Sequence, residues 1–195
     1  MKDDFWYESH LEMDYMYLLE IDPDVIAYRS QPFKIQYFYE GKERSYTPDL
    51  AVKRTDRRQI VEIKPQNKVS SEKNQVLFSQ IAPKCSEEGW EFIVVTDKAI
   101  RVKPKLNNIK TLYYYAKVPL NLHDYINLKN YFKDKNSVSI EKLEEDLSHT
   151  EVDRTKIYRA IYYGILEADL MQPIGSKSIV RFSSITFDPK RFKIS

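Results

Sequence analysis

Two carboxylates and a lysine lie close together in the segment SYTPDLAVKRTDRRQIVEIKPQ. Asp49 stands at the head of one apolar run, and Glu62 and Lys64 are two residues apart in the next. Both runs are typical of β-strands, in which residues two apart point to the same face. If the two strands are neighbours, the three charged side chains can converge. Such charges are also common on exposed strand faces without any function, so at this point both interpretations stay open.

A divalent cation is the partner that this set of groups predicts. The carboxylates of Asp49 and Glu62, with the backbone carbonyl of Ile63, suit Mg²⁺, and Mn²⁺ can substitute for it. The cation would lower the pKa of a bound water and stabilise charge on a phosphate in the transition state. Lys64 would orient or help to deprotonate the nucleophile, or bind the phosphate. The predicted chemistry is metal-dependent hydrolysis of a phosphodiester.

A third carboxylate belongs to the first predicted helix. Ser9 and Glu12 have the spacing of a capping box, and a stripe of apolar residues follows at helical spacing. Glu12 flanks this stripe, where its charge costs desolvation unless something positive meets it. We therefore expect Glu12 to join the site, as a metal ligand directly or through water. Capping alone is the simpler interpretation, and the two are compatible.

The elements around these residues predict an α/β domain over residues 1–116. After the first helix, VIAYRS and KIQYFYEGKERSYTPDLAV are typical of strands, with EGKE as a hairpin turn. RRQIVEIK is the next strand, residues 70–88 are a helix ending near Gly89, and WEFIVVTD is a buried strand. Helix, strands, helix and strand in this order indicate layers around one sheet.

A second, smaller domain is predicted over residues 117–195. LNLHDYINLKNYFKDKN is a polar and aromatic helical connector between the domains. Two short helices follow, the first behind the cap Ser139, and then a hairpin that turns at Gly175 and Ser176. Helix, turn, helix and basic hairpin are the outline of a winged helix-turn-helix, although small helix pairs have other uses.

Composition excludes several classes of protein. Cys85 is the only cysteine and the three histidines are scattered, which argues against disulfide frames and zinc clusters. The start MKDDFWYESH lacks the pattern of a signal peptide, and no apolar run is long enough to span a membrane. We therefore expect a cytoplasmic protein that does not contact a membrane.

The charge distribution permits contact with nucleic acid without requiring it. The net charge is +2, but residues 1–66 carry 10 basic and 13 acidic side chains. Basic residues flank the turn between the two strands of the site, and polar residues open the helix that follows. Phosphate contact and a solvated loop remain alternative interpretations for them. The candidates for DNA contact are Lys53, Arg54, Arg57, Arg58, Lys73 and Gln75.

Three acidic residues and a lysine in the order E, D, E-x-K form the constellation of the P-D-(D/E)-x-K nucleases. ESHLEMDYMYLLEIDPDV, YTPDL, IVEIKP and GWEFIVVTDKAI together resemble the TnsA endonuclease subunit of heteromeric transposition systems. The resemblance covers residues 8 to about 115, and the C-terminal outline matches the second domain of the family more loosely. It implies a restriction-endonuclease-like core, a mixed sheet with flanking helices, and the catalytic set Glu12, Asp49, Glu62 and Lys64.

The resemblance also implies an activity and partners. TnsA-like proteins cut the 5′ strands at transposon ends, while an integrase-class transposase (TnsB-like) cuts and joins the 3′ ends. An AAA+ ATPase regulator (TnsC-like) contacts the C-terminal domain. Two alternatives remain: a DNA-binding or adaptor protein on a nuclease-like scaffold, and a stand-alone restriction or repair nuclease of the same fold. The complete catalytic set favours an active transposase subunit.

Overall fold

The computed structural model describes residues 9–183, and the chain divides into two compact units between Val102 and Lys103. This division lies before the boundary at 116/117 that the sequence predicted. The interpretation of the first residues as lacking a signal peptide, and the end of the hairpin beyond residue 183, lie outside the described residues.

The first unit is built on a four-stranded sheet with the order β1-β4-β5-β6. β1 pairs with β4 and β4 with β5 in antiparallel fashion, whereas β5 and β6 are parallel, so the sheet is mixed. A mixed sheet with flanking helices fits a nuclease-like fold. The elements are α1 (His10–Ile21), β1 (Val25–Ser30), β2 (Ile35–Tyr39), β3 (Lys42–Tyr46), β4 (Leu50–Arg54), β5 (Arg58–Lys64), α2 (Gln66–Val69), α3 (Glu72–Glu87), β6 (Glu91–Thr96) and α4 (Asp97–Ile100).

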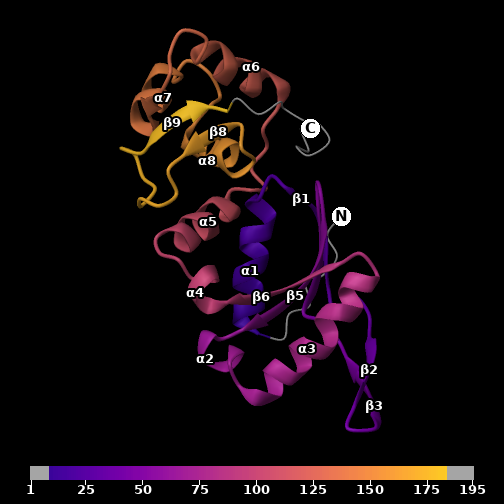
Figure 1. Ribbon diagram of the computed structural model, residues 1–195. Helices are drawn as coiled ribbons and strands as arrows, with labels where there is room; N and C mark the ends of the chain where they lie inside the picture. Colours follow the sequence, from indigo (N-terminus) through magenta and orange to yellow (C-terminus); the bar gives the residue numbers. More distant parts are fainter. Residues whose placement is uncertain (1–8, 184–195) are drawn as a thin grey trace. The chain divides into compact units, whose positions relative to one another are not determined.

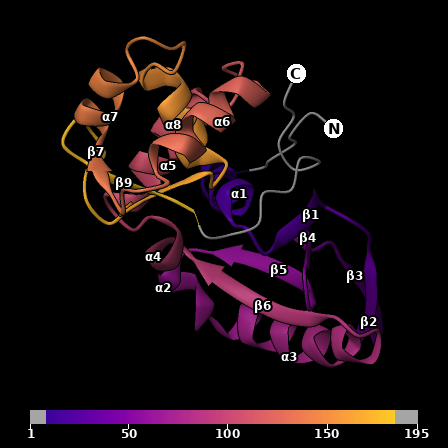
Figure 2. The ribbon, with the colours of Figure 1, turned by 90° about the horizontal axis from the view of Figure 1, so that it is seen from above.

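Helices cover both faces of this sheet, with α1 on one face and α3 on the other (Figures 1 and 2). On the α1 face, Leu19 packs with Leu50 and Val61 in one hydrophobic cluster. On the α3 face, Ile81 packs with Ile60 in a second cluster. The central strand β5 is therefore buried on both sides, which its alternating pattern did not indicate.

The β2–β3 hairpin confirms the turn predicted at EGKE (Figure 1). Tyr39 pairs with Lys42 across a two-residue loop. Both loop residues have positive φ, +52° at Glu40 and +72° at Gly41. A two-residue turn with this backbone matches the twist of the strands, and glycine adopts the conformation at no steric cost. β3 then leads directly into the segment that carries Asp49.

Over residues 103–183, the second unit combines four helices with a small antiparallel sheet of order β7-β9-β8. The predicted cap Ser139 accepts a backbone N–H from Lys142, and Asp153, which was not predicted as a cap, accepts one from Lys156. Its elements are α5 (Lys105–Tyr114), α6 (Leu122–Tyr131), β7 (Val138–Ser139), α7 (Ile140–Asp146), α8 (Arg154–Tyr162), β8 (Leu166–Ala168) and β9 (Ile179–Phe182).

Helix α5 belongs to this second unit, which explains why the division lies before the predicted boundary at 116/117. Tyr113 lies edge-on to Tyr162 at 5.9 Å between ring centroids, and Tyr115 lies edge-on to Tyr158 at 5.1 Å. Both partners are in α8. Ring pairs of this geometry contribute stability beyond that of the area they bury. The role of the tyrosine run at residues 113–115 in fixing α5 to α8 depends on contacts that sequence spacing does not reveal.

The predicted connector is also part of the second unit rather than a linker. Its helix forms as α6, capped by a reciprocal pair of hydrogen bonds between Asn121 and Asp124. Asp124 is 1% exposed and bonds Lys156 of α8 at 2.9 Å. Leu128 is fully buried. The polar residues of this stretch form the helix cap and a buried ion pair. Composition alone does not distinguish such residues from those of a linker.

The predicted hairpin exists, but its strands are shorter and its loop is longer than expected. β8 and β9 pair Glu167 with Arg181, and residues 169–178 connect them. Asn108 of α5 holds this loop with three hydrogen bonds. Its amide donates to the carbonyl oxygens of residues 170 and 172, and its oxygen accepts from the N–H of residue 174.

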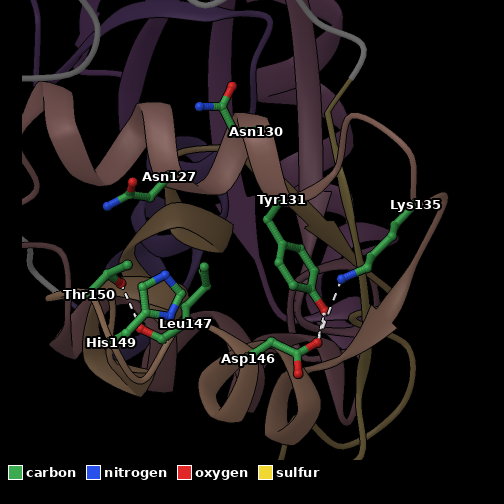
Figure 3. A pocket seen from close by; sticks show the side chains of 8 residues that line it. All are labelled: Asn127, Asn130, Tyr131, Lys135, Asp146, Leu147, His149 and Thr150. Atoms are coloured by element: carbon green, nitrogen blue, oxygen red, sulfur yellow. Dashed lines mark hydrogen bonds and ion pairs between the residues drawn. The ribbon is translucent and has the colours of Figure 1, made fainter.

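A pocket of about 520 Å³ opens in the second unit between the end of α6 and the end of α7 (Figure 3). In it the Tyr131 hydroxyl donates to Asp146 at 2.7 Å, and the Lys135 ammonium lies 3.6 Å from the same carboxylate. The lining residues are Asn127, Asn130, Tyr131, Lys135, Asp146, Leu147, His149 and Thr150.

Among residues 9–183, no helix is both long enough and apolar enough to cross a membrane.

Candidate active site

The antiparallel pairing of β4 and β5 brings Asp49 to Glu62 and Lys64. Leu50 pairs with Val61, so the residue before β4 lies beside the last residues of β5. The Asp49 carboxylate accepts a hydrogen bond from the backbone N–H of Ile63 at 2.6 Å. This bond fixes Asp49 against the strand that carries the other two groups.

Lys64 joins the two carboxylates. Its Nζ lies 2.5 Å from Glu62 Oε1 and 4.0 Å from Asp49 Oδ2. The three side chains converge as their spacing predicted. The ammonium of Lys64 therefore lies between two carboxylates, where the sequence predicted a metal ion.

The alternating pattern suggested that Glu62 lies on an open strand face, but it does not. It is 3% exposed, because α3 and the end of β3 cover this side of β5. The Tyr46 hydroxyl donates to Glu62 Oε2, so both oxygens of the carboxylate are engaged. Replacing Glu62 by alanine would leave the buried Tyr46 hydroxyl without its acceptor and would remove the nearer carboxylate partner of Lys64. Truncation of Glu62 would therefore disturb the core, and glutamine is the appropriate replacement.

Burial dominates the electrostatics of the site. It raises the pKa of Asp49 to about 7, and the charge of Glu62 adds to this shift. The Ile63 N–H and the charge of Lys64 act in the opposite direction. Burial and the adjacent Glu62 also raise the pKa of the Tyr46 hydroxyl, which remains a neutral donor.

Lys64 keeps its positive charge in these surroundings. Burial favours the neutral amine, but the hydrogen bond to Glu62 and the charges of Glu62 and Asp49 outweigh it and raise the pKa of Lys64. The ammonium of Lys64 and each of the two carboxylates thus stabilise one another.

Glu12 comes from α1, on the other side of the strand ends. Ser9 is the N-cap of this helix, and its Oγ accepts from the Glu12 N–H at 3.2 Å and donates to Glu12 Oε1 at 2.9 Å. The predicted cap is confirmed. Glu12 is 8% exposed, and its charge acts on both Asp49 and Lys64. It is therefore part of the same electrostatic cluster.

The basic residues around the β4–β5 turn do not lie beside the site. Lys53 pairs with Arg58 at the opposite ends of the two strands, four residues or about 13 Å from Asp49. Arg54 bonds Asp22 at 2.7 Å, and Arg57 bonds Asp56 at 2.8 Å. Adjacency in sequence placed them near the site, but the strands carry them away from it. DNA contact by these residues stays a prediction.

Arg58 and the polar residues at the start of α3 have other surroundings. The guanidinium of Arg58 lies over the Trp90 ring, 4.9 Å from its centroid, and donates to the carbonyl of Glu88. Lys73 and Gln75 are exposed in the first turns of α3, and Gln75 Nε2 donates to the carbonyl of Val69. Their predicted contact with DNA is likewise untested.

The donor set fits a hard divalent cation that keeps part of its water shell. Asp49 and Glu62 supply two carboxylates that already attract the ammonium of Lys64, and Mg²⁺ is commonly held by one or two carboxylates in proteins. Within the described part of the chain, no group of three or more His, Cys, Asp or Glu side chains is placed to hold a metal ion. Direct ligation by Glu12 thus remains a prediction.

Comparison with known families decides which nuclease this site resembles. Residues 22–97 match the family described as TnsA-like endonuclease N terminal. The resemblance to TnsA is confirmed. The matched segment contains Asp49, Glu62 and Lys64, whereas Glu12 precedes it and the second unit follows it. A search of curated proteins found no match.

Tyr46 is the residue of this site that sequence reasoning missed. The segment SYTPD places it three residues before Asp49, at the end of a predicted strand. Its type gave no signal, because the chain has fifteen tyrosines. Its position at the head of the Pro-Asp segment was the signal available.

Proposed function

We propose that this chain is a metal-dependent DNA endonuclease that cuts the 5′ strands at transposon ends during cut-and-paste transposition. The observation that carries the proposal is the convergence of Asp49, Glu62 and Lys64 at adjoining strand ends. The match of residues 22–97 to the TnsA-like endonuclease family supports it. Phosphodiester hydrolysis is the chemistry to which both observations point.

Asp49 and Glu62 would hold Mg²⁺, or Mn²⁺ in its place, with the Ile63 carbonyl and water as further ligands. A bound Mg²⁺ supplies an activated water and charge stabilisation on the phosphate. The two carboxylates provide the negative charge that makes the site selective for cations. Glu12 adds to this charge from α1, directly or through water.

Lys64 would bind a phosphate oxygen or orient the attacking water. Its ammonium occupies the space between the carboxylates and is 28% exposed at the side chain, so it can reach solvent. A cation that neutralises Asp49 and Glu62 would release Lys64 from them. The ammonium would then be available to the phosphate at the moment when charge develops there.

The second unit would be a winged-helix-like domain that contacts partner proteins more than DNA sequence. The order of α6, β7, α7, α8, β8 and β9 supports the winged-helix assignment. The basic residues of α8 are engaged within the unit. Arg154 bonds Glu144, Lys156 bonds Asp124, and Arg159 lies under the Tyr163 ring. A recognition helix would instead offer such residues to the major groove.

The proposed partners are an integrase-class transposase and an AAA+ ATPase regulator, the latter through the second unit. A partner is also needed on electrostatic grounds. The net charge of the chain is only +2, which gives little attraction to phosphate and thus weak binding to duplex DNA. The chain alone should therefore cut plain duplex poorly. An adaptor on a nuclease-like scaffold is the alternative, but it would not require a buried and a partly buried carboxylate around a lysine.

A strand-specific cleavage assay on transposon-end DNA tests this function. In the presence of the transposase and ATPase of the same element, and of Mg²⁺, the wild-type chain should cut the 5′ strands. Asp49→Asn and Lys64→Met should each lose about 100-fold or more of this rate, because each removes charge from the reacting centre. Omission of the partners should also suppress cleavage.

Lys42→Met is the matched control, because Lys42 is exposed at the turn of the β2–β3 hairpin and is not among the candidates for DNA contact. It should retain the wild-type rate. Wild-type rates in Asp49→Asn or Lys64→Met, or efficient cutting by the lone chain, would contradict the proposed function.

A further inference from the structure

Tyr46 contacts the site through its hydroxyl alone. Its ring is 8% exposed and packs with Ile60, Ile81 and Cys85 on the α3 face of the sheet. The hydroxyl points out of this cluster and donates to Glu62 Oε2. The tyrosine thus links the hydrophobic core of the first unit to a carboxylate of the proposed metal site.

The two oxygens of Glu62 have different partners. Oε2 accepts from Tyr46, and Oε1 lies 2.5 Å from the ammonium of Lys64. The ammonium of Lys64 also lies 4.0 Å from Asp49 Oδ2, so Lys64 links Glu62 Oε1 to Asp49. The terminal torsion of a glutamate is broad unless a hydrogen bond restricts it. The Tyr46 hydroxyl supplies that restriction.

We propose that Tyr46 is a positioning residue that turns Glu62 Oε1 toward Asp49, so that the pair can bind a divalent cation. This inference rests on the proposed function, because it assumes that Glu62 is a metal ligand. Ligating carboxylates are themselves hydrogen-bonded, and loss of such a partner weakens metal binding. Tyr46 acts through Glu62 and has no role in contacting the substrate.

Removal of the hydroxyl alone tests this role. Tyr46→Phe retains the ring that packs with Ile81 and leaves Glu62 Oε2 without its donor. Mn²⁺ binding to the full-length chain, without DNA, can be followed by electron paramagnetic resonance of the free ion. We expect the affinity of Tyr46→Phe for Mn²⁺ to fall by about 10–100-fold.

Two variants separate positioning from general loss of structure. Ile81→Val loosens the cluster around Tyr46 without touching Glu62. Tyr28→Phe removes another tyrosine–carboxylate bond, from the Tyr28 hydroxyl to Glu20 at 2.6 Å, away from the site. Both should bind Mn²⁺ with wild-type affinity, even where thermal unfolding shows that Ile81→Val is less stable.

Each outcome decides between the inference and the function on which it rests. Equal Mn²⁺ affinity of wild type and Tyr46→Phe would overturn the inference alone, as would an equal loss in Ile81→Val. Absence of Mn²⁺ binding in the wild type, or undiminished binding in Glu62→Gln, would overturn the proposed function and the inference with it.

Discussion

Asp49 and Glu62 illustrate how a strand end can keep charged groups in a buried place. Glu62 is nearly inaccessible, and its carboxylate is satisfied by Tyr46 and Lys64. Asp49 depends on a backbone N–H and a more distant ammonium. Buried charges persist only where such partners exist, and the incomplete compensation at Asp49 is what a cation would complete.

The pH dependence of stability should report the strain at Asp49. Burial and Glu62 raise the pKa of Asp49 from 3.8 to about 7. Between these values the folded chain holds a proton that the unfolded chain has lost, so the stability from this group is lost as the pH rises from about 4 to 7. Asp49→Asn should therefore be more stable than the metal-free wild type at pH 8, on the order of 2 kcal/mol, and not at pH 4.

Urea unfolding at pH 4, 6 and 8 measures this difference. Asp56→Asn is the control, because the Asp56 side chain is 68% exposed and its replacement should give no such pH-dependent gain. A gain in Asp49→Asn that is the same at all three pH values would contradict the role of burial at Asp49.

The sequence predicted the charged residues of the site better than their surroundings. Alternation in IVEIK correctly placed Glu62 and Lys64 on one face of β5, and strand pairing placed Asp49 beside them. It did not show that α3 covers this face, because a five-residue pattern records which side a residue takes and not what packs there. Tyr46 was missed for the same reason.

At the scale of elements, helix caps were the most predictable features. Ser9 and Ser139 were recognised from local sequence, because a cap is a contact within one turn. The positions of α5 and α6 were not recognised. α5 is held by contacts to α8 and to the β8–β9 loop, and α6 by a contact to α8, all of them distant in sequence.

Asn108 should determine the order of the β8–β9 loop. It is 5% exposed, and its side chain makes three hydrogen bonds to the backbone of residues 170–174. Asn108→Ala would leave these groups without their partner and should lower the free energy of unfolding by about 1–3 kcal/mol. Limited proteolysis should cut within residues 169–178 faster than in wild type. Asn107→Ala, at the exposed neighbouring position, should change neither quantity.

At the scale of the whole molecule, the division between Val102 and Lys103 predicts which fragments fold. A fragment of residues 103–195 retains α5 and its packing on α8, and should unfold cooperatively on heating. A fragment of residues 117–195 lacks α5 and should unfold at lower temperature or without cooperativity. Circular dichroism on the two fragments measures this. Equal midpoints and equal cooperativity would favour the boundary at 116/117 that the sequence predicted.

The metal is the centre of the whole account, and its position can be observed directly. Anomalous diffraction from crystals of the full chain soaked in Mn²⁺ locates the ion without reference to activity. We predict a peak between Asp49 and Glu62, with one oxygen of each carboxylate as a ligand and Lys64 moved away from Glu62 Oε1. A peak elsewhere, with the side chains of Asp49 and Glu62 pointing apart, would contradict the account.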